Sequence, residues 1–482
     1  MAVAAVSARG ARARPCDPAW LSLLAAALLA AGGCRHYEPA PLAPADSAAA
    51  LESRSLADPG LRALFDELRP GSWPLARWDL TALTLAALYF HPSLDVARAH
   101  WRAVEAGVRT AGARPNPTLS VTPQYVANAA GATPWDITSF LDWPIETAGK
   151  RGHRIEGAEQ LATATRHDID TAAWQVRSEL RTRLIDFAAA RARVEQLGRE
   201  QSAQREVVAL LDQRVRAGAA STTEVAPARL AELQSAADLA EVERQLREAR
   251  VRVAEAVGVT APALDGIEID FPLDAPIPAA EAAPDELRRQ ALQSRPDLLA
   301  TLAEYAASEA ALQLEIARQY PDLRLGPGYE YDQGLNKWST IGVTLELPVL
   351  NRNQGPIGEA EARRSEVAAR FQALQAAVIA ELERALANRD SAREALGRSE
   401  AALTAERERL RATAQALAAG ATDRLALQTA QAELARAERM HVDAQVRLQQ
   451  ALGDLEAAVQ QPLELGVAVQ QGRAPAAGSP AP

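Results

Sequence analysis

Six histidines are the side chains in this sequence best suited to hold a metal ion or to transfer a proton at neutral pH. They are scattered along the chain, without carboxylate or thiol partners at the spacing of a metal site. They are His36, His91, His100, His153, His167 and His441. The sequence also lacks a phosphate-binding glycine loop and a GxSxG motif. It therefore predicts no metal site, no cofactor and no enzyme activity.

Cys34 is the residue whose context indicates a covalent modification. Three arginines precede an apolar stretch at 21–30, which is the pattern of a secretory signal peptide at 1–33. The small residues before Cys34 resemble the bacterial lipoprotein cleavage box, although Ala31 stands where leucine is usual. We expect Cys34 to carry an N-terminal lipid; the alternative is cleavage nearby, which leaves a free thiol. Arg35, rather than Asp, favours the outer membrane by the same resemblance.

The mature chain is acidic and has one cysteine. Removal of the signal peptide deletes three arginines and Asp17, so the formal net charge changes from −10 to −12. An acidic chain disfavours nucleic acid as a partner and does not oppose the passage of cations. Because Cys16 lies in the signal peptide, no internal disulfide can form, and stability must come from packing.

The elements that position these residues follow from an internal duplication. At a constant offset of 204 residues, ARPNPTL (113–119) matches ARQYPDL (317–323), and Pro144 matches Pro348. A second similarity, at an offset of 202, joins VRAGAASTTEV (215–225) to LAAGATDRLAL (417–427). Each half is therefore predicted to repeat one order of elements: helix, two strands, long helix, glycine turn and helix.

The two repeats define the predicted domain boundaries. The first repeat spans 91–258, with helices at 93–113, 150–217 and 222–258 and strands at 118–126 and 135–143. The second spans 284–460, with helices at 284–319, 356–419 and 421–460 and strands at 323–331 and 339–347. We expect an extended lipidated segment and an equatorial region at 34–90, a proline-rich linker at 259–283 and a disordered tail at 461–482.

The long helices carry apolar residues at steps of three and four, which is the period of a left-handed coiled-coil seam. A helix over 150–217 would be on the order of 100 Å long, more than a globular domain encloses. Gly218 and Gly420 are expected to reverse the chain into antiparallel hairpins. Two short helices placed end to end nearly match one long helix, which suits a hollow wall; a solid rod is the alternative.

The four predicted strands alternate apolar and polar residues, and each has about nine residues, the length that a tilted transmembrane strand needs. Their acidic positions are expected to face a lumen: Asp136, Asp142, Glu330 and Glu346. A pair of soluble hairpins packed on helices is the alternative. Four strands cannot close a barrel, so two copies would supply eight strands and three copies twelve, which is wide enough for a conduit.

The join between the strands and the long helices also occurs twice, and we expect it to be the seam between a barrel and a helical tube. Pro348 is expected to end the strand ladder because it has no N–H, and Pro144 takes the same place in the first repeat. The predicted seam residues are Pro144, Gly149, Gly152, Pro348, Asn351, Arg352 and Gly355. We favour a structural role for them; Arg352 could contact neighbouring chains or lipid headgroups.

From about 80 to 460 the chain resembles the TolC-like outer-membrane factor family, most specifically in LPVLNRNQG (347–355). His91 stands where that family commonly has asparagine. The resemblance implies a mainly α fold with a small transmembrane β part, in which long antiparallel coiled-coil helices form a periplasmic α-barrel. It also implies a homotrimer with a twelve-stranded barrel in outer-membrane lipid of a Gram-negative bacterium. The implied partners are a periplasmic adaptor and an inner-membrane efflux pump, of RND type.

The resemblance further implies that the adaptor docks at the helix tips. The matching positions are Gly218, Ser221, Thr222, Gly420, Thr422 and Asp423. Asp423 would narrow the entrance of the tube, or would serve only as the N-terminal charge of a helix. PVLNRNQG and PIETAGKRG look closest to the cobalt-zinc-cadmium and copper-silver efflux ducts, which says little about cargo.

The sequence supports a passive exit duct, with heavy-metal cations as the expected cargo. The same duct could serve drug efflux or type I secretion. A periplasmic coiled-coil adaptor or structural lipoprotein would also explain the helices and Cys34, but it would leave the duplicated strand pairs without a purpose.

Overall fold

The computed structural model describes residues 36–275 and 283–462. Cys34, the signal peptide and the end of the predicted tail lie outside the described residues. The chain divides into two compact units, 1–53 and 54–482. The described part of the first unit contains one helix, α2 (Pro44–Glu52), whose residues are all exposed.

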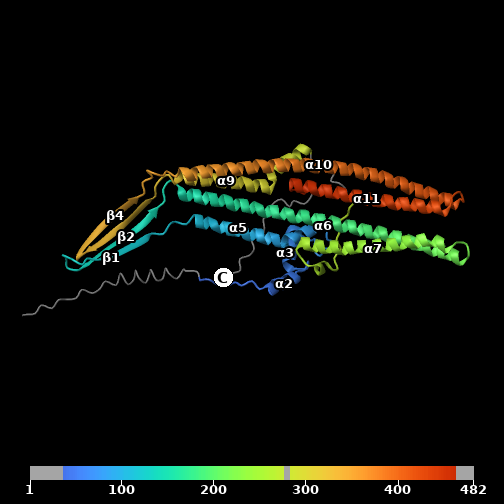
Figure 1. Ribbon diagram of the computed structural model, residues 1–482, viewed down its shortest axis with the longest axis horizontal. Helices are drawn as coiled ribbons and strands as arrows, with labels where there is room; N and C mark the ends of the chain where they lie inside the picture. The colour runs from blue at the N-terminus through green and yellow to red at the C-terminus, as the bar shows by residue number, and fades with distance from the viewer. Residues whose placement is uncertain (1–35, 276–282, 463–482) are drawn as a thin grey trace, which may run out of the picture. The chain divides into compact units, whose positions relative to one another are not determined.

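The second unit is mainly helical (Figure 1). The segment before the first repeat forms α3 (Pro59–Leu68) and α4 (Leu80–Phe90). The first-repeat helices are α5 (Pro92–Ala111), α6 (Lys150–Arg216) and α7 (Thr222–Val257), followed by the 3-10 turn η2 (Ala261–Leu264). The second-repeat helices are α8 (Pro284–Ser294), α9 (Pro296–Ala317), α10 (Gln354–Ala418) and α11 (Arg424–Val459). None of the described helices combines the length and apolarity needed to cross a membrane.

Two expectations about helices were wrong. The single helix predicted over 284–319 is two helices, because Pro296 begins α9 and the residue before it, Arg295, is extended at φ −63° and ψ 124°. The first repeat has the same break, where His91 is extended before Pro92. The extended segment expected at the start of 34–90 instead contains α2. The equatorial region expected in the same range contains α3 and α4, which Asp58 and Asp79 cap.

In the second unit, each long helix has two short helices beside it. Figure 1 shows α5 and then α7 along α6, and α9 and then α11 along α10. The two repeats meet where α6 packs against α9 and α11. Gly218 and Gly420 reverse the chain with φ values of +74° and +71°, a conformation that glycine adopts without strain.

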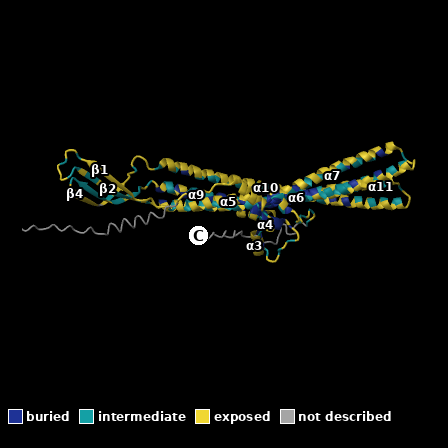
Figure 2. Cartoon of the chain, turned by 90° about the horizontal axis from the view of Figure 1, so that it is seen from below, coloured by how far each residue is buried: buried dark blue, intermediate teal, exposed yellow. Residues whose placement is uncertain are grey.

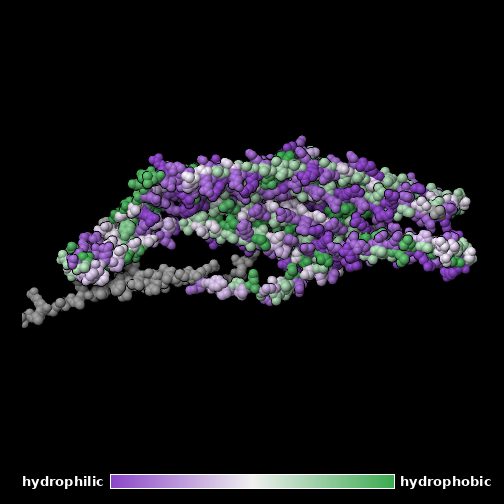
Figure 3. All heavy atoms as spheres, viewed as in Figure 1, coloured by the Kyte–Doolittle hydropathy of each residue, from purple (hydrophilic) through white to green (hydrophobic). Residues whose placement is uncertain are grey.

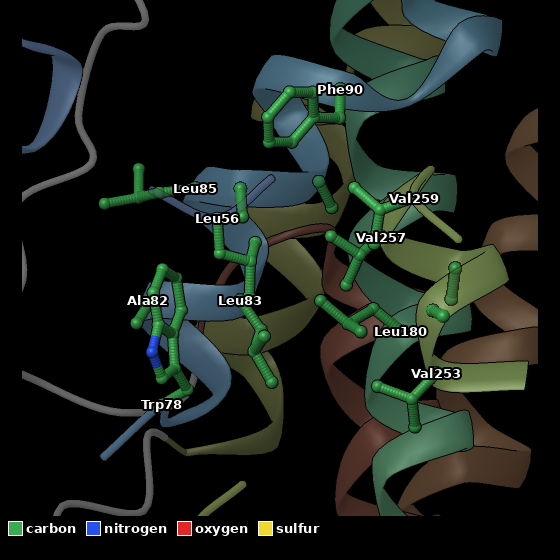
Figure 4. Packing of buried hydrophobic residues seen from close by; sticks show 14 of the residues in the cluster. Leu56, Trp78, Ala82, Leu83, Leu85, Phe90, Leu180, Val253, Val257 and Val259 are labelled. Atoms are coloured by element: carbon green, nitrogen blue, oxygen red, sulfur yellow. The ribbon is translucent and has the colours of Figure 1, made fainter. Parts of the chain in front are cut away.

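The largest hydrophobic cluster of the described residues lies where α3 packs on α4, and α4 packs on α6 and on the end of α7 (Figure 4). Phe65, Leu83, Leu180 and Val253 are completely buried in it. In Figure 2 this part of the second unit contains much of the dark blue, buried residue set. Arg54 Nη1 donates to Phe90 O at 2.7 Å and to Gly258 O at 2.8 Å, which joins the ends of α4 and α7. The core therefore depends on the 54–90 segment as well as on the repeats.

The strands form one antiparallel sheet in the order β1-β2-β3-β4. They are β1 (Thr118–Tyr125), β2 (Trp135–Ile145), β3 (Leu323–Asp332) and β4 (Leu335–Leu345). β2 and β3 join the hairpins of the two repeats, and β1 and β4 are the edges. A bulge between Gly326 and Gly328 shifts the register of the second hairpin.

The strand ends differ from the prediction. Pro144 does not end its strand, since it lies within β2 and pairs with Arg324. β4 ends at Leu345, so Pro348 does not end the ladder, and Glu346 lies outside the strand instead of facing a lumen from it. The physical reason is the partner strand: β3 begins at Leu323, directly opposite Leu345, so residues 346–349 have no strand beside them in the described sheet.

Candidate functional site

The sheet has one polar face and one apolar face. Residues that lie opposite each other on neighbouring strands share a face, and the pairs Gln124–Asp136, Asp136–Asp332 and Glu330–Lys337 place these residues together. All six charged residues of the four strands belong to this polar face. They are Asp136, Asp142, Arg324, Glu330, Asp332 and Lys337.

Acids outnumber bases on the polar face. Arg324 Nη1 lies 2.8 Å from Asp142 Oδ2. Lys337 Nζ lies 3.2 Å from Glu330 Oε1 and 2.8 Å from Asp332 Oδ2. With Asp136 included, four carboxylates face two cationic side chains, so the face carries a net negative charge that attracts cations.

The opposite face is apolar and open. Its side chains include Leu119, Val121, Trp143 and Val343, which are 65, 56, 57 and 64% exposed. Ring pairs Tyr125–Trp135 and Tyr329–Trp338 lie near the strand ends away from the helices. Figure 3 shows hydrophobic surface over the sheet and at its junction with the helices, beside mostly hydrophilic helix surface. Such a face suits contact with lipid, with aromatic residues at the membrane interface.

The seam of the first repeat is closed by a lysine that sequence reasoning missed. Lys150, the first residue of α6, has an 8% exposed side chain. Its Nζ donates to Asp322 Oδ1 at 2.6 Å and to Tyr320 O at 2.7 Å. Thr147 N also donates to Asp322 Oδ1, at 3.0 Å. The segment before β3 in the second repeat is therefore fixed to the start of α6 in the first.

This clamp changes the acidity of Asp322. Burial alone would raise the pKa of its carboxyl group, but the hydrogen bonds from Lys150 and from the Thr147 N–H outweigh burial and hold the pKa below its usual value. Both Lys150 and Asp322 belong to the motifs that mark the seam and the repeat. No signal in the sequence shows that the two motifs touch.

The seam of the second repeat is held by Asn353, whose Nδ2 donates to Glu315 Oε2 at 2.8 Å. Asn353 takes a left-handed conformation, φ +63°, immediately before α10, and its Nδ2 donates to Glu315 O at 2.8 Å. Asn351 Oδ1 accepts from Asn353 N at 2.9 Å, and Arg352 N donates to Gln354 Oε1 at 3.1 Å. Asn351 takes part in these contacts with its side chain, whereas Arg352 takes part only with its backbone N–H, so the role of the Arg352 side chain stays a prediction.

The predicted glycines of the seam do two different things. Gly149 precedes α6 with φ +74°, a left-handed conformation. Gly152 and Gly355 lie in the first turns of α6 and α10, where an added Cβ would meet no atom within 4 Å. Only Gly149 is therefore required by its backbone conformation.

The predicted tip residues lie at the end of the second unit away from the sheet (Figure 1). Ser221 Oγ accepts from Glu224 N at 3.3 Å, and Glu224 Oε1 accepts from Ser221 N at 3.2 Å, which is a capping box at the start of α7. Asp423 Oδ1 accepts from Ala426 N at 2.9 Å and caps α11. Thr222 is the first residue of α7, and Thr422 lies in the turn after Gly420.

A second missed cluster joins α6 to α11. Glu456 is 2% exposed, and its Oε2 lies 2.5 Å from Arg177 Nη1 and 3.2 Å from Arg181 Nη1. Arg181 also donates to Gln449, whose Nε2 donates to Leu273 O at 3.2 Å. The period of the apolar residues marks α6 as a packing helix but does not show that charged residues are buried on it.

The histidines are not gathered into one site. Across 36–275 and 283–462, no group of three or more His, Cys, Asp or Glu side chains is arranged to hold a metal ion. His91 Nδ1 accepts from Ser93 N and caps α5, while His441 Nδ1 lies 3.2 Å from Ser399 Oγ. The described residues thus offer a charged sheet face and a helical frame.

Comparison with known proteins gives a family match over most of the chain. The model of the family described as "Outer membrane efflux protein" matches residues 85–259 and 287–460, one segment for each repeat.

The individual relatives share less than a third of their aligned residues with this chain. The cobalt-zinc-cadmium resistance protein CzcC of Cupriavidus metallidurans is 29% identical over 276 residues, which cover 57% of this chain and 63% of that protein. The pyoverdine export outer membrane protein OpmQ of Pseudomonas aeruginosa is 26% identical over 358 residues, 69% of this chain and 73% of that protein. The structure of the outer membrane protein VceC from Vibrio cholerae aligns with a TM-score of 0.64 and 20% identity over 80% of this chain and 97% of VceC, which shows a shared fold.

Proposed function

Since this chain belongs to the outer membrane efflux protein family, we propose that it is the outer-membrane exit duct of a tripartite efflux system. The family consists of passive outer-membrane channels and not of enzymes. In this proposal, cargo passes from a periplasmic adaptor and an inner-membrane pump, of RND type, through the duct to the outside.

The single observation that carries the proposal is the two-faced sheet at one end of a helical frame. All six strand charges share one face, whereas the other face is apolar and open. A soluble hairpin pair would cover its apolar face with the helices of its own chain. A transmembrane sheet leaves that face to lipid and turns the charged face to water.

A single chain supplies too few strands. Four strands cannot close around a lumen, and β1 and β4 have no partner on their outer sides within the described sheet. Three copies would supply twelve strands, as in the homotrimer that the resemblance implies. Asp136, Asp142 and Glu330 would then line the lumen.

For the cargo, we propose heavy-metal cations. The relative CzcC is a cobalt-zinc-cadmium resistance protein by name, and the polar face of the sheet is acidic. A specific metal site is not required, because a passive duct conducts best when it binds cargo weakly. OpmQ, named for pyoverdine export, favours a second candidate in which the same duct exports an organic molecule.

The anchoring and docking sites belong to the same proposal. A lipid on Cys34 would hold the chain at the outer membrane of a Gram-negative bacterium. The helix tips around Gly218, Ser221, Thr222, Gly420, Thr422 and Asp423 would receive the adaptor. Asp423 already has a capping role, so we assign it to the tip structure rather than to a gate.

Membrane fractionation tests the duct, and deletion tests the cargo. We expect the native protein in the outer membrane as a trimer that needs detergent for release and heat for dissociation on gels. A monomer released by salt or lipase would instead support the adaptor alternative.

Deletion of the gene should lower the tolerance of the cells to zinc, cobalt or cadmium. Unchanged metal tolerance with raised drug sensitivity would reject the metal cargo.

A further inference from the structure

The free edges of the sheet are β1 and β4. Every residue of β1 is exposed, and β4 is paired only with β3. Exposed apolar side chains also continue past the end of β4, where Leu347, Val349 and Leu350 are 67, 72 and 97% exposed. An open strand edge with apolar residues is unstable in lipid, so another chain segment must cover it.

The first repeat shows what is missing at the end of β4. β1 begins opposite Asp142, so the last residues of β2, 143–145, are held only by β3. At the offset of 204, the equivalents of 143–145 are 347–349. These have no strand beside them within the chain, although they belong to the same part of the repeat.

The duplication includes the register of the strands. Adding 204 to both members of the pair Leu119–Leu141 gives Leu323–Leu345, which is an observed pair. The pairs at Ser120, Val121 and Thr122 transfer in the same way, to Arg324–Thr344, Leu325–Val343 and Gly326–Gly342. The near-helix half of each hairpin is therefore equivalent, and the bulge after Gly326 changes only the far half.

The offset of 204 also converts the pairing of β2 with β3, which joins the two repeats, into a pairing of β4 with β1. In every pair of β2 with β3 the two residue numbers add up to 468, for example Ile145–Leu323 and Trp143–Leu325. Moving the β2 member forward by 204 and the β3 member back by 204 leaves this sum unchanged. The result joins the end of β4 to β1, which cannot occur within one chain because these are opposite edges of the sheet.

We propose that β4 extends through residues 346–349 when it pairs with β1 of a second copy of this chain, in the register in which the paired residue numbers add up to 468. The inference rests on the proposed duct and specifies how its copies join. Leu347 then lies opposite Val121 of the partner subunit, and Val349 opposite Leu119 of the partner subunit.

The proposed register keeps the two faces of the sheet intact. Leu347 and Val349 meet apolar residues, and Glu346 meets Thr122 of the partner subunit on the polar face. Pro348 lies opposite Ser120 of the partner subunit. A proline is tolerated there, since Pro144 has the equivalent place within β2, opposite Arg324.

The seam between copies would differ from the seam within a chain. Lys150 and Asp322 form the ionic clamp within the chain, and their equivalents at the offset of 204 are Gln354 and Thr118. Gln354 of one copy thus approaches Thr118 of the partner subunit. Around the assembly, the charged Lys150–Asp322 seam within each chain would alternate with a seam between copies, where the equivalent side chains, Gln354 and Thr118, are neutral.

Cysteine cross-linking tests the register in the full-length protein in its native membrane. The pair Leu347→Cys with Val121→Cys is in register, because directly opposite side chains have Cβ atoms within disulfide reach. The pair Leu347→Cys with Leu119→Cys lies on the same face but is out of register by two residues. Single variants control for disulfides to Cys34.

We expect mild oxidation to convert the in-register variant into reducible multimers, at least about tenfold more than the out-of-register variant, because diagonal neighbours lie farther apart. Val349→Cys with Leu119→Cys is the second in-register pair and should behave alike. Equal or stronger cross-linking of the out-of-register pair would overturn the proposal. So would an uncross-linked but heat-dissociable outer-membrane oligomer, in which case the duct itself stands. A monomer outside the outer membrane would reject both.

An added clamp gives an independent test. The double variant Gln354→Lys with Thr118→Asp places the Lys150–Asp322 pair at the seam between copies. We expect a higher temperature of oligomer dissociation than in the native protein, with Gln354→Lys alone as the control. A double variant no more stable than this control would contradict the proposed contact between Gln354 and Thr118 of the partner subunit.

Discussion

Lys150 and Asp322 lie in different repeats, and the Nζ of one is 2.6 Å from the Oδ1 of the other. The lysine begins the long helix α6, and the aspartate precedes strand β3. The same nitrogen also donates to Tyr320 O at 2.7 Å. This contact joins the start of α6 in the first repeat to the segment before β3 in the second.

Removing the lysine should weaken the seam. We expect Lys150→Met to lower the free energy of unfolding by about 1–2 kcal/mol, because two charge-assisted hydrogen bonds are lost and Asp322, which is 40% exposed, is partly compensated by water. The melting temperature of the detergent-extracted protein measures the effect. Arg151→Met is the matched control, because it removes only one exposed hydrogen bond, from Arg151 Nε to Gly112 O at 2.7 Å, and should cost less than about 1 kcal/mol. An equal loss in the two variants would contradict the assigned role of Lys150.

The seam should also respond to acid. The folded-state pKa of Asp322 is lowered, so its contribution to stability is fully present above the ordinary carboxyl pKa of about 4 and is lost as pH falls through the folded value. Between about pH 5 and pH 3, the melting temperature of the native protein should therefore fall by more than that of the Asp322→Asn variant. Identical pH profiles for the two proteins would count against the clamp.

Two variants of Asp423 can show whether this residue stabilises α11 by its capping hydrogen bond or by its negative charge. Asp423→Ala should destabilise α11 by about 1 kcal/mol, since Ala426 N loses its acceptor. Asp423→Ser keeps a capping oxygen without the charge and should retain most stability. Thermal melts of the two variants separate these roles. If Ser is as harmful as Ala, the charge and not the cap is what matters.

The buried ion cluster between α6 and α11 should contribute strongly to the stability of the fold. Glu456→Ala leaves Arg177 and Arg181 without the carboxylate they share, so we expect a loss of about 3–5 kcal/mol of stability, measured by chemical denaturation. Glu438 pairs with Arg199 at 3.6 Å in a more exposed place, and Glu438→Ala should cost less than about 1 kcal/mol. Similar losses would show that burial of Glu456 is unimportant.

The charged face of the sheet should set ion preference. In planar bilayers, Glu330→Gln should lower the cation-to-anion permeability ratio by about twofold, because it removes a lumen carboxylate near Lys337. Lys337→Gln should raise the same ratio. Reversal potentials in a salt gradient measure both, and a common direction of change would contradict the proposed lumen face.

Much of the fold could be predicted from local patterns. The two repeats, the long helices, the glycine turns at Gly218 and Gly420 and the alternation of the strands all follow from spacing along the chain. The family match confirms the outer-membrane efflux assignment. The break at Arg295 was within reach of the same reasoning, because a proline follows it as one follows His91.

The errors concern contacts between distant segments. The end of β4 depends on where β3 begins, not on Pro348, and Pro144 remains in β2 because β3 extends beside it. Likewise, the sequence gives no sign that Lys150 bonds Asp322 or that Glu456 is buried against α6.

The sequence by itself determined the duplication, the element types and the faces of the strands, since these depend on residue spacing within single elements. Only the tertiary structure decided the strand order, the ends of β2 and β4 and the partners of Lys150 and Glu456. A strand ends where its neighbour ends, and a buried charge persists only where a partner from another element meets it. Both conditions join residues far apart in the chain, and a periodic pattern does not record such distances.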